Sequence, residues 1–493
     1  MSSYKSIIAY SILLVLLMTI SPFAVLTAHA DTYPEQVSGN VIKIGMTISL
    51  TGKYATEGKQ ALCGIKAAIA WLNDKGGITV GGTTYKFQLI YYDDQSSSDL
   101  VSTLYNKLIN EDQVNFLLAP YSSGLTSAAA PIAEQYKVLM LSHGGASDKI
   151  FEQGYQYLVQ VLSPASMYLV SALDLIKKYI PDAKIAFIYE NKPFAKAVIE
   201  GARKHAEELG LNVVYVNAYE AGTTDFSTYI QAAMDKGADV LLGGGHYEDG
   251  KALVKQAHDL GWKLKFIAIL VAPAQPKFYD ELKADVAEGV AFPAQWAQQA
   301  EYSPDVASSL GLEWYGPTKD EWLQYFNQIC PELEAPAYQA AEAGAAVIVL
   351  AKAIEVAGSL DSTAVRQALN NLDLLTFFGR FKIDPQTGKQ MGHQMVIMQW
   401  QNGKREIIFP ESVATADPII GPPNWWPEGP IYPTTATQPS PTTETTSSPE
   451  SSPSGTTSVE TTTPEKGVGT GTIAAIIVII IIIVAAVALL RRK

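Results

Sequence analysis

The chain has 493 residues, a formal net charge of −13 and 47% hydrophobic residues. The acidic balance argues against nucleic acid or an acidic surface as a binding partner. The hydrophobic share is ample for a large core, and the length exceeds one ordinary domain. We therefore expect more than one folded unit.

The N-terminus has the features of a secretory signal. Lys5 precedes an apolar stretch that runs from Ile7 to about Leu26, and Ala28-His29-Ala30 has the small-x-small form that signal peptidase cleaves. The alternative is an uncleaved membrane helix, but Ser21-Pro22 interrupts the run and no positive flank follows. We predict that residues 1–30 are a signal peptide.

Short apolar runs then alternate with amphipathic patterns along the chain, which predicts strands that alternate with helices. The first expected series is strand 41–47, helix 57–74, strand 87–92, helix 98–110, strand 114–118, helix 126–136 and strand 138–142. The second is helix 164–179, strand 184–189, helix 193–209, strand 212–218, helix 226–236, strand 240–243, helix 249–260 and strand 266–270. Such repetition predicts an α/β fold with parallel sheets covered by helices, in two Rossmann-like halves.

Small, hydroxylic and aromatic residues follow several of the expected strands. In such folds ligands bind at the carboxyl ends of the strands, where loops meet helix N-termini. The residues there include Ser122-Ser123, Gly145-Ala146-Ser147 and His246-Tyr247. Backbone amides beside a serine hydroxyl suit a carboxylate or another anion. The alternative is ordinary helix capping by Ser and turn formation by Gly.

A series of short motifs has a familiar order and spacing. They include Ile42-Lys43-Ile44-Gly45, Trp71 to Ile78, Tyr92-Asp93-Asp94-Gln95, Ala119 to Ser123, and Asp384 to Gly388 before Gln399-Trp400. Over about residues 41–410 the chain resembles the leucine/isoleucine/valine-binding type of ABC-transporter solute receptor, which has a type I periplasmic-binding fold. The resemblance implies two lobes that close on a small molecule and deliver it to membrane permease subunits.

The resemblance also implies that three hinge crossovers join the lobes, near residues 162–165, 289–293 and 380–383. A bilobed domain would then fill residues 31–430. Lobe 1 would take about 41–163 and 292–380, and lobe 2 about 164–291 and 381–410.

In amino-acid receptors of this type, a serine and a backbone-plus-threonine pair hold the ligand's α-carboxylate and ammonium. The resemblance gives the first role to Ser123 with Ser122, and the second to Gly145, Ala146 and Ser147. The threonine hydroxyl is lost at Ala146 unless Ser147 replaces it.

The second lobe departs from the family pattern. Phe194 stands where a tyrosine is common, and Leu270-Val271 stand where an acidic residue binds the ammonium. A buried ammonium without a carboxylate is costly, so we expect a carboxylate or amide with an apolar body rather than a zwitterion such as leucine. Glu57, Glu248 or Asp249 could supply the charge instead.

Among the remaining polar and aromatic residues, His246 beside Tyr247 is the better candidate for ligand contact, whereas His143 is interpreted as a polar wall or turn residue. Tyr54 and Trp296 are weaker candidates. The histidine spacing fits no zinc site, and the sequence has no motif for a nucleotide, a catalytic serine or a metalloprotease. We expect a binding protein without metal or cofactor, not an enzyme.

The last segment predicts a membrane anchor. Residues 431–466 are rich in Ser, Thr and Pro and cannot form a core. Residues 467–490 include an apolar run long enough to span a bilayer, and the Arg-Arg-Lys of 491–493 favours a cytoplasmic end. We expect a stalk, a transmembrane helix and an extracellular globule, an architecture that looks archaeal. The alternative is a structural or adhesive surface protein on the same stalk.

The sequence leaves the state of its two cysteines open. Cys63 and Cys330 could pair in an extracellular protein, but the sequence alone does not bring them together. The globule is expected to be monomeric.

Overall fold

The computed structural model describes residues 30–425. Apart from Ala30, the predicted signal peptide, stalk and C-terminal membrane helix lie outside these residues. Within residues 30–425, no single helix is long and apolar enough to cross a membrane; two consecutive helices pass the same test together, but they are bent by 103° at their junction.

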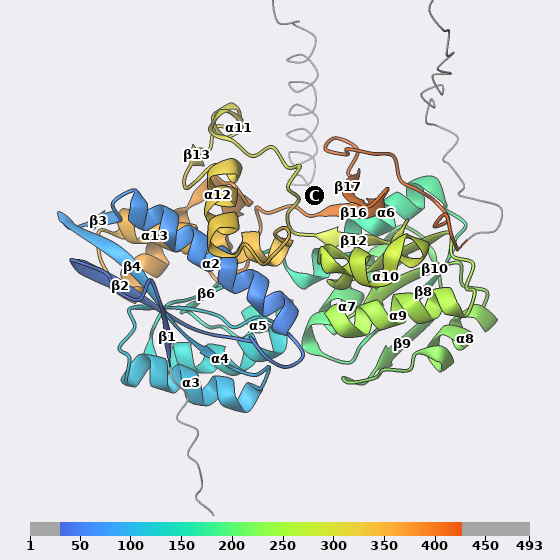
Figure 1. The fold of residues 1–493 in the computed structure, drawn as a ribbon, viewed down its shortest axis with the longest axis horizontal. Coiled ribbons are helices and arrows are strands. Elements are labelled where there is room, and N and C mark those ends of the chain that lie inside the picture. The colour runs from blue at the N-terminus through green and yellow to red at the C-terminus, as the bar shows by residue number, and fades with distance from the viewer. Residues whose placement is uncertain (1–29, 426–493) are drawn as a thin grey trace, which may run out of the picture. The chain divides into compact units, whose positions relative to one another are not determined.

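The first sheet is seven-stranded and mostly parallel (Figure 1). Its path is β1-β4-β2-β5-β6-β7, with β3 paired to β4; β1 and β3 are antiparallel to β4, and the other pairs are parallel. The strands are β1 (Asp31–Tyr33), β2 (Asn40–Ile48), β3 (Ile78–Val80), β4 (Thr83–Asp93), β5 (Phe116–Leu118), β6 (Met140–Ser142) and β7 (Leu158–Gln160). Strands such as β5 are buried at every residue, as expected of a parallel sheet covered on both faces.

The second sheet is also seven-stranded and runs β17-β16-β12-β11-β10-β8-β9. Its five strands from β12 to β9 are parallel, and β16 and β17 extend it antiparallel. The strands are β8 (Lys184–Glu190), β9 (Asn212–Tyr219), β10 (Val240–Gly244), β11 (Phe266–Ile269), β12 (Ala291–Ala294), β16 (Val396–Gln401) and β17 (Lys404–Phe409). A small third sheet holds β13 (Glu313–Trp314), β14 (Asp373–Thr376) and β15 (Gly379–Lys382).

The helices divide between the two large sheets. With the first sheet lie α2 (Ala55–Asp74), α3 (Ser98–Asn110), α4 (Ser123–Tyr136), α5 (Asp148–Phe151), α12 (Lys319–Ile329), α13 (Tyr338–Ala357) and α14 (Ser362–Asn371). With the second lie α6 (Val170–Tyr179), α7 (Pro193–Glu208), α8 (Ser227–Asp235), α9 (Tyr247–Asp259) and α10 (Lys277–Ala287). The short α11 (Pro304–Ser309) contacts β13. The expected two-lobed α/β fold is confirmed, and we call the first-sheet unit lobe 1 and the second-sheet unit lobe 2.

The chain passes between the two large sheets three times, so each lobe is built from separate segments. It leaves the first sheet after β7, leaves the second sheet after β12, and returns to the second sheet between β15 and β16. The second passage therefore starts later than residues 289–293, because β12 is itself hydrogen-bonded to β11 and β16. The third runs through residues 383–395, after β15 has paired with β14.

The helix expected from Pro164 is interrupted at the first passage. A 3-10 turn at Ala165–Met167 precedes α6, and both the backbone N–H and the hydroxyl of Ser166 donate to the Asp148 carboxylate, at 3.0 and 2.9 Å. A side chain of α5 thus fixes the backbone where the chain enters lobe 2.

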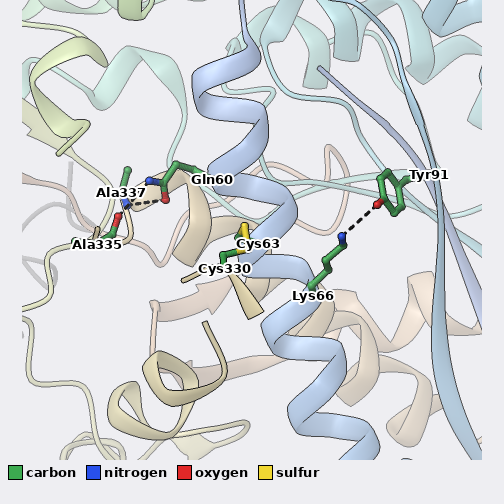
Figure 2. Close-up of a disulfide and its surroundings, with 7 residues drawn as sticks. All are labelled: Gln60, Cys63, Lys66, Tyr91, Cys330, Ala335 and Ala337. Carbon is green, nitrogen blue, oxygen red and sulfur yellow. Dashed lines mark hydrogen bonds between the residues drawn. A yellow bond between two sulfur atoms is a disulfide. The ribbon is translucent and has the colours of Figure 1, made fainter. Parts of the chain in front are cut away.

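Helices α2 and α13, far apart in sequence, cross at very short range in lobe 1 (Figure 1). Gly64 permits the contact, since a Cβ atom there would lie 1.9 Å from the carbonyl oxygen of Ala340. The start of α13 is held by Gln60, whose amide donates to Ala335 O at 3.1 Å while its oxygen accepts from Ala337 N at 3.0 Å. Figure 2 shows these bonds beside a disulfide that joins Cys63 of α2 to Cys330 after α12. The two cysteines, whose pairing the sequence left open, therefore form a disulfide in the folded protein.

We predict that the double variant Cys63→Ala/Cys330→Ala has a free energy of unfolding lower by about 2–5 kcal/mol, because the disulfide constrains a long loop of the unfolded chain. Thermal unfolding with and without a reductant measures this effect. The wild type in reductant should approach the variant, and equal melting temperatures for oxidised wild type and variant would contradict the prediction.

Candidate functional site

A small cavity lies between the loops that follow the strands of both sheets. Lobe 1 contributes residues after β5 and β6 and from α13, lobe 2 contributes residues at α7 and α9, and the first passage contributes the rest. Its wall consists of Tyr121, Gly144, Leu162, Tyr168, Phe194, His246, Tyr338 and Glu342. The cavity has a volume of only about 10 Å³, far less than the ~300–1,000 Å³ of sites for drug-sized ligands. In this arrangement of the lobes it has room for about one water molecule, so a solute can enter only when the lobes move apart.

Aromatic rings make most of this wall, and they come from both lobes. His246, at the N-cap of α9, enters lobe 1 between Tyr54 and Tyr121, with ring centroids 4.5 and 5.8 Å away. Phe194 lies 5.6 Å from His246 and 5.1 Å from Tyr168. The two lobes are thus in direct contact through rings around the cavity.

The His246 imidazole is neutral in this setting. It is buried, which moves its pKa well below the ordinary value, and the charge of Lys53 lowers it further. Its Nδ1 has no hydrogen-bond partner and lies 3.8 Å from Oε1 of Glu57. A neutral ring with an unpaired nitrogen is available to a solute as a donor or an acceptor.

Glu57, in the first turn of α2, is fully buried at the lobe contact. Its Oε1 accepts the backbone N–H of Tyr247 across the lobes at 3.0 Å, and its Oε2 has no partner. Burial raises its pKa to about 7; Asp249 raises it too, while backbone hydrogen bonds and Lys53 oppose the shift. Glu57 is a buried acid that titrates near neutrality.

The two other acids that could replace the family's carboxylate lie elsewhere. Glu248 is exposed and pairs with Lys251 at 2.9 Å. Asp249 is buried, but it accepts the Tyr219 hydroxyl and the backbone N–H of His246. Both carboxylates therefore already have polar partners in lobe 2.

Lys53 forms an ion pair that joins the two lobes. It follows β2 in lobe 1, forms an ion pair with Glu190 at the end of β8, and lies 3.7 Å from Asp249. Glu190 is almost fully buried, and this burial raises its pKa. The pair was not singled out in the sequence, because neither residue belongs to a motif.

The hydroxyls of Ser122 and Ser123 are used inside lobe 1. Ser122 caps α4 with its hydroxyl, which accepts the N–H of Leu125 at 3.3 Å, and holds an unusual φ of 85°. Ser123 Oγ accepts the N–H of Ser147 at 3.0 Å. Neither is among the residues that form the cavity wall. The capping alternative describes Ser122, whereas the Ser123 hydroxyl joins the start of α4 to the loop at Ser147.

The Gly145-Ala146-Ser147 loop packs against the first passage. The carbonyl oxygen of Ala146 accepts the N–H of Ala165 at 2.8 Å, and a Cβ on Gly145 would lie 2.5 Å from the Thr126 hydroxyl. Ser147 borders a separate groove with Lys149 and Pro193. Only the neighbouring Gly144 reaches the cavity.

Four of the five remaining candidates from the sequence lie at or directly behind the cavity wall, and Tyr247 does not. Phe194 and His246 form the wall, and Tyr54 and Glu57 stand directly behind His246. The Tyr247 ring instead lies beside Lys277, whose Nζ is 4.0 Å from its centroid.

Trp296, His143 and Leu270 do not form part of the cavity wall. Trp296 borders a different, open groove with Trp400 and Arg405. His143 is buried with both ring nitrogens unpaired, and burial lowers its pKa to about 4. Leu270 is buried in the core of lobe 2.

Tyr168, Tyr338 and Glu342 were missed by the sequence reasoning. A signal was present for two of them. Tyr338 and Glu342 are four residues apart and share a helix face, and Glu342 is an acid within the apolar, buried stretch 338–351 of α13.

Comparisons with known proteins agree with this architecture. A family described as periplasmic binding protein matches residues 41–405. The chain is 26% identical over 392 residues to Leu/Ile/Val-binding protein homolog 7 of Brucella abortus (strain 2308), covering 76% of this chain and 93% of that protein. It is 26% identical over 363 residues to Leu/Ile/Val-binding protein homolog 1 of Brucella suis biovar 1 (strain 1330), covering 73% and 91%.

Two solved structures show the same fold. One is the branched-chain amino acid transporter substrate binding protein LivJ from Streptococcus pneumoniae in complex with isoleucine, at 20% identity and a TM-score of 0.64, covering 75% of this chain and 100% of that one. The other is an ABC transporter solute binding protein from R. palustris in complex with 4-hydroxybenzoate, at 20% identity and a TM-score of 0.63, covering 78% and 99%. These relatives are solute-binding proteins, not enzymes.

We predict that Ser123→Ala lowers the free energy of unfolding by about 1–3 kcal/mol, because the buried N–H of Ser147 loses its acceptor. Urea unfolding measures this. Ser127→Ala, which removes the hydroxyl of an exposed serine one helical turn later on α4, is the control and should cost less. Unchanged stability combined with weaker solute binding would return Ser123 to the ligand role given by the resemblance.

Glu57 should make stability depend on pH. The folded state holds its proton more tightly than the unfolded chain, so the Glu57 contribution should fall as pH rises from 4.5 to about 7. Glu57→Gln should remove this loss and be more stable than the wild type above neutral pH, by up to about 3 kcal/mol. Urea unfolding of both proteins across this range is the measurement, and parallel pH profiles would refute the assignment.

Proposed function

The chain belongs to the periplasmic binding protein family, and we propose that it is the extracellular solute receptor of an ABC importer. The observation that supports this most is the buried cavity walled by residues from both lobes. A solute that contacts both lobes stabilises their closed arrangement through its differential contact with that state. The relatives are solute-binding proteins, which does not favour the alternative of a structural or adhesive surface protein.

Closure in this proposal depends on polar contacts as well as rings. Glu57 accepts the Tyr247 N–H, Lys53 pairs with Glu190, and Lys277 of lobe 2 donates to the Thr56 hydroxyl at 3.0 Å. The three passages between the lobes act as hinges, and opening requires these contacts to break. Release to a permease would follow when the permease stabilises the open arrangement.

The surroundings of the receptor are part of the proposal. Cleavage after residue 30 would export the globule, the Ser/Thr/Pro segment 431–466 would act as a stalk, and the apolar segment 467–490 would anchor it in the cell membrane. The partners are then a small solute and the permease subunits, and the globule works as a monomer.

The solute is an amino acid, an amide or a carboxylate of small size. Related structures were solved with isoleucine and with 4-hydroxybenzoate, so the fold accepts both zwitterions and aromatic acids. The rings of the cavity wall favour a partly apolar body.

Thermal unfolding of the full chain against a panel of amino acids, amides, carboxylates and short peptides tests this function. A solute at about 100 times its Kd stabilises the native state by about 2.7 kcal/mol, which raises the melting temperature by several degrees. A panel in which no small solute shifts the transition would contradict the proposal.

We predict that Lys53→Met weakens binding of the solute found in this way by roughly 10-fold or more, because Glu190 and Asp249 would lose the cation that holds them at the closed contact. Calorimetric titration measures the change. Lys149→Met is the matched control, since Lys149 pairs with Glu200 across the lobes at an exposed site, where water and salt screen the ion pair. Equal effects of the two substitutions would remove Lys53 from the closing mechanism.

A further inference from the structure

Glu342 has the features of a ligand-binding group rather than of a structural one. It projects from α13 into the cavity wall, is 1% exposed, and its Oε2 has no hydrogen-bond partner. Burial alone accounts for the shift of its pKa well above the ordinary value. An unpaired carboxyl in an apolar interior destabilises the protein, so its presence calls for a group that it binds.

The rings around Glu342 present an environment suited to a cation. Tyr121, Tyr168 and Tyr338 each interact electrostatically with Glu342, and Phe194 and the neutral His246 complete the wall. Aromatic faces attract ammonium groups through their quadrupoles, more strongly where water is excluded. The wall contains no lysine or arginine among the described residues.

A second acid lies near the same tyrosines. The charge of Glu57 acts on Tyr121 and Tyr338, the same tyrosines that feel Glu342. Within residues 30–425, the cavity wall contains no cation, and the nearby Lys53 pairs with Glu190 and lies beside Asp249. A solute carboxylate placed between these groups would therefore face two acids, whereas an ammonium would be attracted to both.

We propose that the cavity recognises the ammonium group of a small organic amine, with Glu342 as its counter-ion and the rings of Tyr121, Tyr168, Tyr338 and Phe194 around it. The inference rests on the proposed solute-receptor function and names its solute class. It revises the sequence expectation that a bound ammonium would lack a carboxylate, because lobe 1 supplies one from α13 in place of the family position at Leu270. The rings come from both lobes, so a bound cation holds the lobes together.

The test uses calorimetric titration of the full chain with four probes of related shape. These are 3-methylbutylamine, leucine, 4-methylpentanoate and benzoate, which carry an amine alone, an amine with a carboxylate, and a carboxylate alone in aliphatic and aromatic form. We expect the two amine-bearing probes to bind and the two acids to bind at least 30-fold more weakly.

Glu342→Gln separates the charge from the hydrogen bond, because glutamine keeps the shape and a donor but not the anion. We expect the substitution to weaken amine binding at least 30-fold and to leave the melting temperature equal or higher. Glu355→Gln, in the last turn of the same helix and half-exposed, is the control and should leave binding unchanged.

The release of protons on amine binding provides a second measurement. An ammonium that pairs with Glu342 must displace its proton, so amine binding should release protons, counted by titration in two buffers of different ionisation enthalpy. The other titratable groups in the cavity wall are Tyr121, Tyr168, Tyr338 and His246, and Glu57 lies behind His246. Glu57→Gln removes the one with a pKa of about 7, and proton release should persist in that variant but vanish in Glu342→Gln.

The outcomes distinguish this inference from the function on which it rests. Binding of the acids, with retained affinity in Glu342→Gln, would overturn the amine inference and leave a solute receptor that uses a protonated Glu342 as a hydrogen-bond donor. The absence of binding by all four probes and by the broader solute panel would overturn both.

Discussion

The close crossing of α2 and α13 is the contact on which the rest of the site depends. Gly64 allows it, since any side chain there would collide with the backbone at Ala340, and the Cys63–Cys330 disulfide and the Gln60 bonds fix it on one side. Because two helices from distant parts of the sequence are held at backbone contact, Glu57 and Glu342 are brought to the same tyrosines. A slightly wider crossing would separate these acids.

The lobe contact combines apolar rings with several buried acids. Glu57, Glu190 and Asp249 meet there, and Lys53 is the cation that the structure places among them. Burial raises the pKa of Glu57 and of Glu190, and the charge of Asp249 raises both further, so the closed state benefits from any additional positive charge. This electrostatic situation gives the proposed amine solute a reason to favour closure that a neutral solute would lack.

Local pattern predicted the elements well. The expected helix 98–110 matches α3, and the expected strand 184–189 is one residue shorter than β8, because alternation of apolar runs and amphipathic stretches reports burial directly. The candidates Phe194, His246, Tyr54 and Glu57 lie at or beside the cavity. The serine hydroxyls do not form its wall: that of Ser122 caps α4 and that of Ser123 accepts the N–H of Ser147. The same hydroxyl can cap a helix or bind a ligand, and the sequence alone does not show which N–H groups lie near it.

The sequence by itself determined the two-lobed α/β fold, the loops at which a site would form, and the family resemblance, since these depend on local periodicity and on the order of motifs along the chain. Only the tertiary structure decided that Cys63 pairs with Cys330, that Lys53 meets Glu190, and that Glu342 faces the cavity. The disulfide, the ion pair and the cavity around Glu342 each bring together residues that are far apart in the sequence. Their proximity results from packing of helices and lobes, which no local pattern encodes.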